Sequence, residues 1–232
     1  MTVALFACHS VEYLGLLGGL GSFVVRRLGR MPPRIGWADP PMHIAFATAL
    51  VGGLGLLALQ PGWLVVPRVA AEALALVLCL KGRPLVAPVA VLAAGLLAIT
   101  GHASGAGAMF ADVLHALSSG MWAGGVLALG SLRPPGGWQS VEAKAMLDRF
   151  GRVAVIAFGV TALTGVLRAT EQLHDVSDLW TTTYGIVLGL KTAGVFVMLA
   201  LAPAWRRGPF EAYAAVFVVG ATALLAALPV PA

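Results

Sequence analysis

Charged residues are scarce in this chain of 232 residues: Asp, Glu, Lys and Arg make up 11% of it, while 59% of the residues are hydrophobic. Soluble domains contain about 25% charged and 45–50% apolar residues. With so few polar side chains the chain cannot cover the surface of a soluble globule. Its mean hydropathy of +0.90 therefore predicts an integral membrane protein.

Cysteine is also rare. Two cysteines exclude a disulfide scaffold and a Cys-rich metal cluster. Phosphate-binding motifs such as Gly-x-x-x-x-Gly-Lys are absent from the sequence, so we expect no ATPase and no enzymatic activity. The net charge of +5 does not indicate a nucleic-acid partner, because basic residues also mark the cytoplasmic loops of membrane proteins.

Long apolar runs dominate what remains. Crossing a bilayer takes about 20 helical residues, and none of the runs alternates as a β-strand would. Eight runs approach or reach this length, separated by turn-forming Pro and Gly: Val3–Val25, Met42–Gln60, Trp63–Leu80, Leu85–Gly101, Ala108–Leu132, Phe150–Ala169, Tyr184–Trp205 and Phe210–Leu228. We predict an all-α polytopic membrane helix bundle of about eight transmembrane helices. It forms one integral membrane domain over residues 1–232, with four spans in 1–101 and four in 102–232.

The basic residues predict an orientation. Cytoplasmic loops attract Lys and Arg, and twelve of the fifteen basic residues lie at the odd-numbered linkers: Arg26, Arg27, Arg30, Arg34, Lys81, Arg83, Arg133, Lys144, Arg149, Arg152, Arg206 and Arg207. We therefore expect the odd linkers to face the cytoplasm and both termini to face outward. The longest linker, 133–149, has room for a short interfacial helix.

Small residues recur at a spacing that allows helices to approach closely. Examples are Gly15 with Gly19 and Gly120 with Gly124. We expect these positions to serve packing alone.

The few ionisable residues inside the spans lie mostly in their outer halves. His9 with Glu12 and Asp112 with His115 are three residues apart, so each pair shares a helix face. His102 ends the fourth span. Such residues face a bundle interior or a wet cavity and usually pair, because a charge at the bilayer centre costs at least about 2.5–3.5 kcal/mol. We predict a polar cavity that opens to the outer side.

Some of these groups also have a purely structural interpretation. Arg68 and Glu72 are four residues apart and are expected to pair on one helix. Lys191 is expected to be a counter-ion for a carboxylate: Glu12, Glu72 or Asp112. Arg168 lies near the interface and is expected to snorkel. The histidines and acids can equally form a hydrogen-bonded structural network.

The donor types favour copper. Imidazole suits copper and zinc, and thioether or thiolate selects Cu(I); zinc-type short spacings are absent. Cys8 and Met1 lie at the same outer end. The candidate metal ligands are His115, Asp112, His102, His9, Glu12 and Met109.

The second half of the chain resembles the copper resistance D family of bacterial inner-membrane proteins (CopD, PcoD and YebZ relatives). The order and spacing of short motifs carry this resemblance, which covers roughly residues 102–205. The motifs are Thr100-Gly101-His102-Ala103, Asp112-Val113-Leu114-His115, Trp122-Ala123-Gly124-Gly125, Arg149-Phe150-Gly151-Arg152, Leu163-Thr164-Gly165, Thr182-Thr183-Tyr184-Gly185 and Leu190-Lys191.

The resemblance implies copper import across the cytoplasmic (inner) membrane, with the lipid bilayer, copper ion and a CopC-like periplasmic carrier as partners. Asp112, His115, Trp122 and Lys191 stand at family motif positions, as does His102 more loosely. One departure is Ile186, where family members often have a basic residue. Trp122 and Lys191, with Arg68 and Glu72, are therefore assigned to the predicted cavity and its ion pairs.

Two other functions remain open from the sequence. The first is a membrane redox protein with b-type haem between two histidines, such as His9 and His115, or His102 with one of these. The second is a structural subunit of a larger membrane complex, with its polar groups buried and paired.

Overall fold

The eight predicted apolar runs all become helices in the computed structural model, which describes residues 2–100, 105–173 and 175–228. No strand occurs within these ranges, so the all-α prediction is confirmed there. The elements are α1 (Val3–Gly29), α2 (Met42–Leu59), α3 (Val65–Leu80), α4 (Val86–Ile99), α5 (Ala106–Gly130), α6 (Val141–Gln172), α7 (Asp178–Thr181), α8 (Thr183–Leu201), the 3-10 helix η1 (Ala202–Arg207) and α9 (Phe210–Ala227).

Among the described residues, six helical segments are long and apolar enough to cross a membrane: α1, α2, α5, α6, α8 with the first part of η1 (Thr183–Trp205), and α9. The other two predicted spans are shorter, since α3 has 16 residues and α4 has 14. At 1.5 Å per residue a 14-residue helix is about 21 Å long, less than the hydrocarbon core of about 30 Å. The count of eight spans therefore stays a prediction.

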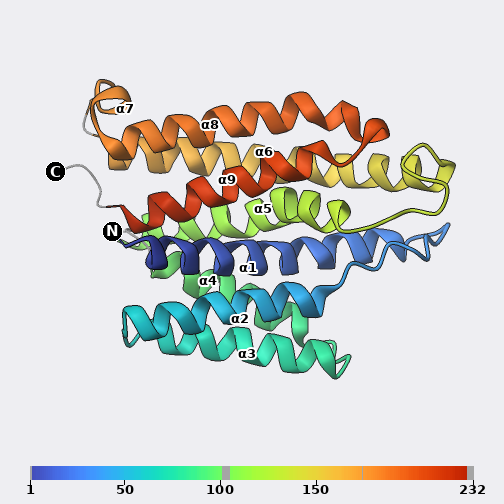
Figure 1. The fold of residues 1–232 in the computed structure, drawn as a ribbon, viewed down its shortest axis with the longest axis horizontal. Coiled ribbons are helices and arrows are strands. Elements are labelled where there is room, and N and C mark those ends of the chain that lie inside the picture. The colour runs from blue at the N-terminus through green and yellow to red at the C-terminus, as the bar shows by residue number, and fades with distance from the viewer. Residues whose placement is uncertain (1, 101–104, 174, 229–232) are drawn as a thin grey trace.

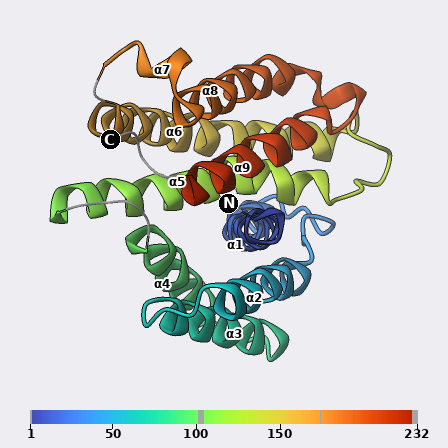
Figure 2. The ribbon, with the colours of Figure 1, turned by 60° about the vertical axis from the view of Figure 1, so that its left-hand side comes forward.

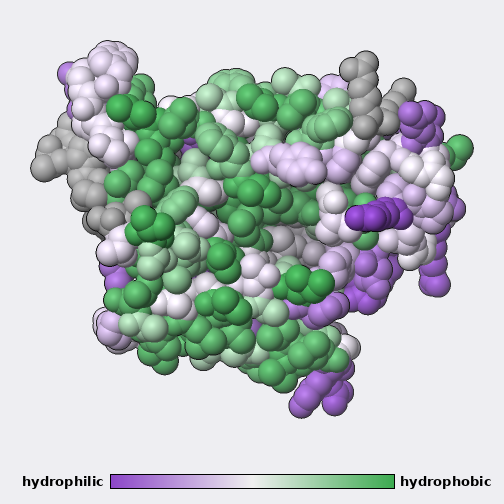
Figure 3. Space-filling model, viewed as in Figure 1, coloured by the Kyte–Doolittle hydropathy of each residue, from purple (hydrophilic) through white to green (hydrophobic). Residues whose placement is uncertain are grey.

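Successive long helices are antiparallel, so the linkers gather at the two ends of the bundle (Figure 1). The four predicted cytoplasmic linkers, which follow α1, α3, α5 and α8, all lie at the right-hand end of that view. The surface is hydrophobic over the sides of the helices and hydrophilic at this same end (Figure 3). The segregation of basic residues that the sequence indicates is thus present in three dimensions.

Helix α1 lies at the centre of the bundle, between α2 on one side and α5 and α9 on the other (Figure 2). Glycine makes this close packing possible. A Cβ at Gly15 would lie 2.2 Å from the backbone N of Ala49, and one at Gly124 would lie 2.0 Å from the carbonyl oxygen of Leu17. The predicted packing role of these small residues is confirmed.

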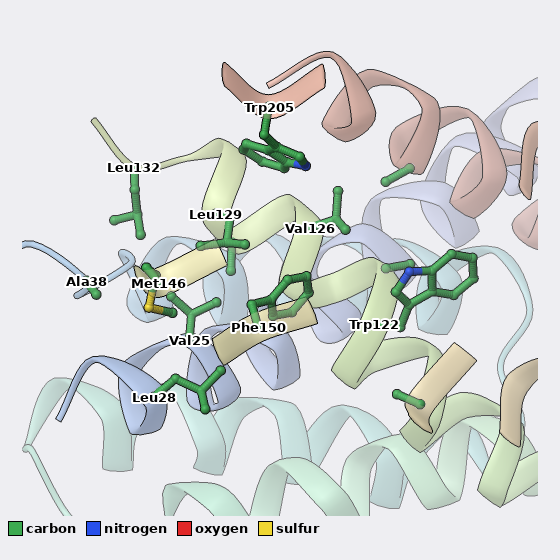
Figure 4. Packing of buried hydrophobic residues seen from close by; sticks show 14 of the residues in the cluster. Val25, Leu28, Ala38, Trp122, Val126, Leu129, Leu132, Met146, Phe150 and Trp205 are labelled. Atoms are coloured by element: carbon green, nitrogen blue, oxygen red, sulfur yellow. The ribbon is translucent and has the colours of Figure 1, made fainter. Parts of the chain in front are cut away.

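The end of the bundle with the basic linkers has an apolar core (Figure 4). Val25, Val126, Leu129 and Met146 are fully buried there, and Phe150 lies among them. These side chains come from α1, α5 and α6, so the core joins the central helix to the segment that follows the longest linker.

Two boundaries differ from the prediction. The expected interfacial helix of the 133–149 linker is continuous with the sixth span as one 32-residue helix, α6. Ser140 caps its start by accepting a hydrogen bond from the Ala143 amide at 3.3 Å. The seventh run ends its α-helix at Leu201 and continues as η1, where Pro203 lacks the amide that an α-helical bond needs.

Candidate functional site

Two clusters of polar side chains lie toward the end of the bundle opposite the basic linkers. We call them the N-terminal cluster (Glu12, Arg68, Glu72 and Thr100) and the C-terminal cluster (Asp112, His115, Ser118, Thr161, Thr164 and Arg168). All these residues except Ser118 and Thr161 lie within about three turns of the helix ends at that side. The polar asymmetry that the sequence predicts is therefore retained in the fold.

The N-terminal cluster joins four helices. The guanidinium of Arg68 on α3 places Nε 2.8 Å from Glu12 Oε1 on α1 and donates from a terminal nitrogen to Thr100 Oγ1, at the end of α4, at 2.7 Å. The carboxyl of Glu72 lies against that of Glu12. Glu12 and Glu72 are fully buried, and Arg68 is 3% exposed.

This geometry corrects one predicted pairing. The ion pair of Arg68 goes to Glu12 across helices and not to Glu72 along α3. Gly53 of α2 leaves the space in which the side chains from α1 and α3 meet.

The C-terminal cluster forms a polar seam between α5 and α6. Arg168 Nε lies 2.6 Å from Asp112 Oδ1, and Arg168 also binds Glu171 one turn further along its own helix. The hydroxyl of Thr161 donates to Ser118 Oγ at 2.8 Å. Arg168 is thus a partner of Asp112 rather than a residue that snorkels away from the bundle.

His115 lies in the middle of this seam, and its contacts define its tautomer. Its Nδ1 is 3.1 Å from the carbonyl oxygen of Thr161 and 3.0 Å from Thr164 Oγ1. A carbonyl oxygen only accepts, and the Thr164 hydroxyl donates its proton to the carbonyls of Val160 and Thr161. Nδ1 must therefore carry the proton in both contacts, which leaves Nε2 of the neutral ring with a lone pair.

Gly165 completes the seat of the imidazole. A Cβ at this position would lie 3.3 Å from Cε1 of His115, tighter than ordinary van der Waals contact. In the Thr164-Gly165 motif of α6, the Thr164 hydroxyl thus hydrogen-bonds the histidine ring, and Gly165 leaves the space that the ring occupies.

The other predicted site residues lie in different surroundings. Lys191 on α8 is half-buried and interacts electrostatically with Asp112 and His115. Trp122 belongs to the apolar core and packs edge-to-face on Phe158, with 4.9 Å between ring centroids. It therefore lies in the core and not in the polar seam.

The remaining candidate ligands are less closely grouped. His9 packs edge-to-face on Tyr13, and its buried Nδ1 has no hydrogen-bond partner among the described residues. Met109 is half-buried, one turn before Asp112 on α5. His102 falls outside the described residues. Within those residues no group of three or more His, Cys, Asp or Glu side chains is arranged to hold a metal ion.

Sequence reasoning missed the partners that cross between helices. Thr161 carries no signal of its own, and Thr164 and Gly165 are visible only as a short motif without an assigned role. Another motif residue, Arg149, donates to the carbonyl of Leu28 in the last turn of α1 and to those of Met31 and Pro33 in the loop that follows. The Thr182-Thr183-Tyr184-Gly185 motif begins α8, where Thr182 caps the Gly185 amide at 3.0 Å.

Comparison with known proteins gives one family. Residues 144–228 match the family model of copper resistance protein D, CopD. The match covers nearly all of α6 and extends through α7, α8 and α9, so it includes Thr164, Arg168 and Lys191 but leaves α5 with Asp112 and His115 outside. No curated protein and no solved structure matches the chain. The resemblance predicted from the motifs is confirmed for this C-terminal segment.

Proposed function

We propose, from the match of residues 144–228 to the copper resistance protein D family model, that the chain carries copper across the cytoplasmic membrane. The family match and the six apolar helices support a copper-resistance membrane protein. In the proposal copper is the cargo, and it enters from the outer side through the polar end of the bundle.

The single observation that carries the proposal is the tautomer of His115. Metal-binding histidines commonly donate their second ring N–H to a carbonyl, which orients the ring and increases the basicity of the ligating nitrogen. His115 has this arrangement, with Nδ1 donating to the Thr161 carbonyl, and in the proposal Nε2 is the nitrogen that binds copper. Imidazole nitrogen is a good ligand for copper.

The charges around His115 suggest how an ion would be accepted. Asp112 is 21% exposed at its side chain and is paired with Arg168, while Lys191 lies close enough to act on both Asp112 and His115. We propose that these cations neutralise the carboxylate when no copper is present and that arriving copper displaces part of this interaction. His9, His102 and Met109 remain proposed additional ligands. We do not propose Glu12, because its carboxylate is fully buried in the N-terminal cluster, whereas the Asp112 side chain is partly exposed.

The direction of transport is proposed from the charge distribution. If the end with the basic linkers faces the cytoplasm, both clusters lie toward the outside. Inward movement of a cation is then favoured by the membrane potential, by about 2.3 kcal/mol per charge per 100 mV. A CopC-like periplasmic carrier is the proposed donor of the ion.

Copper binding to the purified full chain tests the proposal. We expect a low stoichiometry of bound copper that His115→Ala reduces strongly. His43→Ala is the matched control, because His43 is exposed at the opposite end of the bundle. Cellular copper uptake should follow the same order. Unchanged binding and uptake in His115→Ala at normal protein level would contradict the proposal.

A visible absorption spectrum of the same preparation distinguishes haem binding from copper transport. A protein with b-type haem between two histidines shows a Soret band that shifts on reduction with dithionite. Such a band, lost in His115→Ala without bound copper, would replace copper transport by the redox function. A preparation with neither metal nor haem but with stoichiometric partner proteins would favour the structural subunit.

A further inference from the structure

The N-terminal cluster contains more buried acidic groups than basic ones. Two carboxyl groups, Glu12 and Glu72, face one guanidinium, Arg68, and all three side chains are at least 95% buried. If every group is ionised the cluster has one negative charge in excess. A buried charge without compensation is costly by several kcal/mol.

No neighbouring helix supplies the missing positive charge. Helix α2 contains one titratable residue, His43, at its opposite end, and α4 contains none within Val86–Ile99. On α1 the adjacent titratable groups are Cys8, His9 and Tyr13, and Arg68 acts on His9 as a nearby positive charge. On α5 the nearest carboxylate, Asp112, is paired with Arg168. Among the described residues, Arg68 is thus the one cation of this cluster.

Arg68 makes its ion pair and its hydrogen bond to residues other than Glu72. Its Nε meets Glu12 and its terminal nitrogen meets Thr100, whose own hydroxyl donates to the carbonyl of Leu97 at 2.8 Å. Both carboxylate oxygens of Glu72 are buried and accept no hydrogen bond from a described residue. A carboxylate of this kind has neither a counter-charge nor a donor of its own.

The two carboxyl groups converge on a space that α2 leaves open. A Cβ at Gly53 would lie 2.4 Å from Glu72 Oε2 and 3.4 Å from Glu12 Oε1. Gly52 beside it lets α1 approach, since a Cβ there would lie 2.3 Å from the backbone N of Glu12. The site is therefore built by the sequence of α2 as well as by the acids of α1 and α3.

We propose that Glu72, together with the adjacent carboxylate of Glu12, binds one exchangeable monovalent cation, a proton or a sodium ion. The cation balances the excess negative charge and supplies the partner that both oxygens of Glu72 lack. A proton would form a carboxyl–carboxylate hydrogen bond between the two acids; a sodium ion would be coordinated by their oxygens. The site lies outside the segment matched by the CopD family model and does not depend on copper transport.

The first experiment measures the thermal unfolding midpoint of the purified full chain in detergent. One series replaces choline chloride by sodium chloride at constant ionic strength, and a second varies pH at fixed sodium. A bound sodium ion gives a midpoint that rises with sodium. A bound proton gives a midpoint that is insensitive to sodium and falls as pH rises, because proton loss leaves the excess charge uncompensated in the folded state.

Glu72→Gln removes the excess charge and is expected to abolish whichever dependence the wild type shows. Asp148→Asn, an equal change at an exposed acid of α6, should leave that dependence intact. A Glu72→Gln protein with the same sodium and pH dependence as the wild type would overturn the proposal. Glu12→Gln is a second variant that is expected to lose the sodium or pH dependence of the midpoint, because it leaves Glu72 to pair with Arg68.

A direct measurement on the wild type covers the case in which neither variant folds. Radioactive sodium at equilibrium should bind at one ion per chain, or infrared spectra should contain the carbonyl stretch of one buried protonated carboxyl group that is slow to exchange in deuterium oxide. Absence of both signals in folded wild-type protein would equally overturn the proposal.

Discussion

Asp112 and Arg168 form an ion pair across the interface of α5 and α6, with 2.6 Å between Oδ1 and Nε. The pair lies at the end of the same seam that is remote from the basic linkers, and His115 lies further along that seam. It also joins a helix outside the segment matched by the CopD family model to one within it. The two parts of the candidate site are therefore one physical unit.

The first prediction concerns this pair. Arg168→Gln or Asp112→Asn alone should lower the free energy of unfolding by about 1.5–3 kcal/mol, the usual size for a hydrogen bond to a charged group. The double variant should lose less than the sum, since neither charge is then left without its partner. Reversible unfolding of the wild type, the two single variants and the double variant in mixed micelles measures this double-mutant cycle. Strictly additive losses of unfolding free energy would argue against a coupled pair.

The second prediction concerns the hydroxyl that holds His115. Thr164→Val removes the acceptor at 3.0 Å from Nδ1 and should weaken copper binding by about 10–100-fold, as loss of an outer-shell partner of a metal ligand typically does. Thr164→Ser should retain most of the affinity. The matched control is Thr222→Val, because Thr222 also donates to its own helix, at Val218, but belongs to α9 and not to the α5–α6 seam. Equal losses in the two valine variants would indicate a general effect on folding.

The third prediction concerns Arg149, which joins α6 to the end of α1. Arg149→Ala removes hydrogen bonds to the carbonyls of Leu28, Met31 and Pro33. It should therefore destabilise the protein by at least the 1.5–3 kcal/mol or so of one hydrogen bond to a charged group. Arg152→Ala, at an exposed position one turn later, should change stability by less than about 0.5 kcal/mol. Thermal unfolding of the two variants checks both expectations. Equal unfolding midpoints of the two variants would contradict a stabilising role of the Arg149 hydrogen bonds.

The fourth prediction concerns orientation. In a variant with Cys8 and Cys79 replaced by Ala, a single cysteine at Val176 should react with a membrane-impermeant maleimide in intact spheroplasts. One at Pro135 should react only after permeabilisation. Both positions are exposed and lie at opposite ends of the bundle. The reverse labelling would invert the proposed direction of copper movement.

The fold was largely predictable because its signals are local. Each apolar run becomes a helix, and Pro61-Gly62 and Gly208-Pro209 stand where chain direction changes. The exceptions are local too: Ser140 starts α6 earlier than hydropathy alone indicates, and Pro203 converts the end of the seventh run to η1.

The candidate site was predictable only along single helices. The three-residue spacing of Asp112 and His115 correctly places both on one face of α5. Their partners Arg168, Thr161 and Thr164 depend on the register between α5 and α6, which side-chain contacts set and sequence spacing does not encode. For the same reason Arg68 was matched to its neighbour on α3 rather than to Glu12 on α1.

The last prediction compares two glycines of α6. It distinguishes the effect of a tighter contact with the His115 ring from the effect of a change in helix stability. Gly165→Ala would place a Cβ 3.3 Å from the imidazole, so the ring must shift and its Nδ1 contacts to α6 must lengthen. At Gly159 a Cβ meets nothing within 4 Å, so Gly159→Ala should stabilise α6 by about 0.5–1 kcal/mol through its better helix propensity. Copper affinity should fall in Gly165→Ala and stay unchanged in Gly159→Ala. If both variants bind copper like the wild type while nitrogen NMR of His115 still reports a proton on Nδ1, the close fit of Gly165 is not needed for the site.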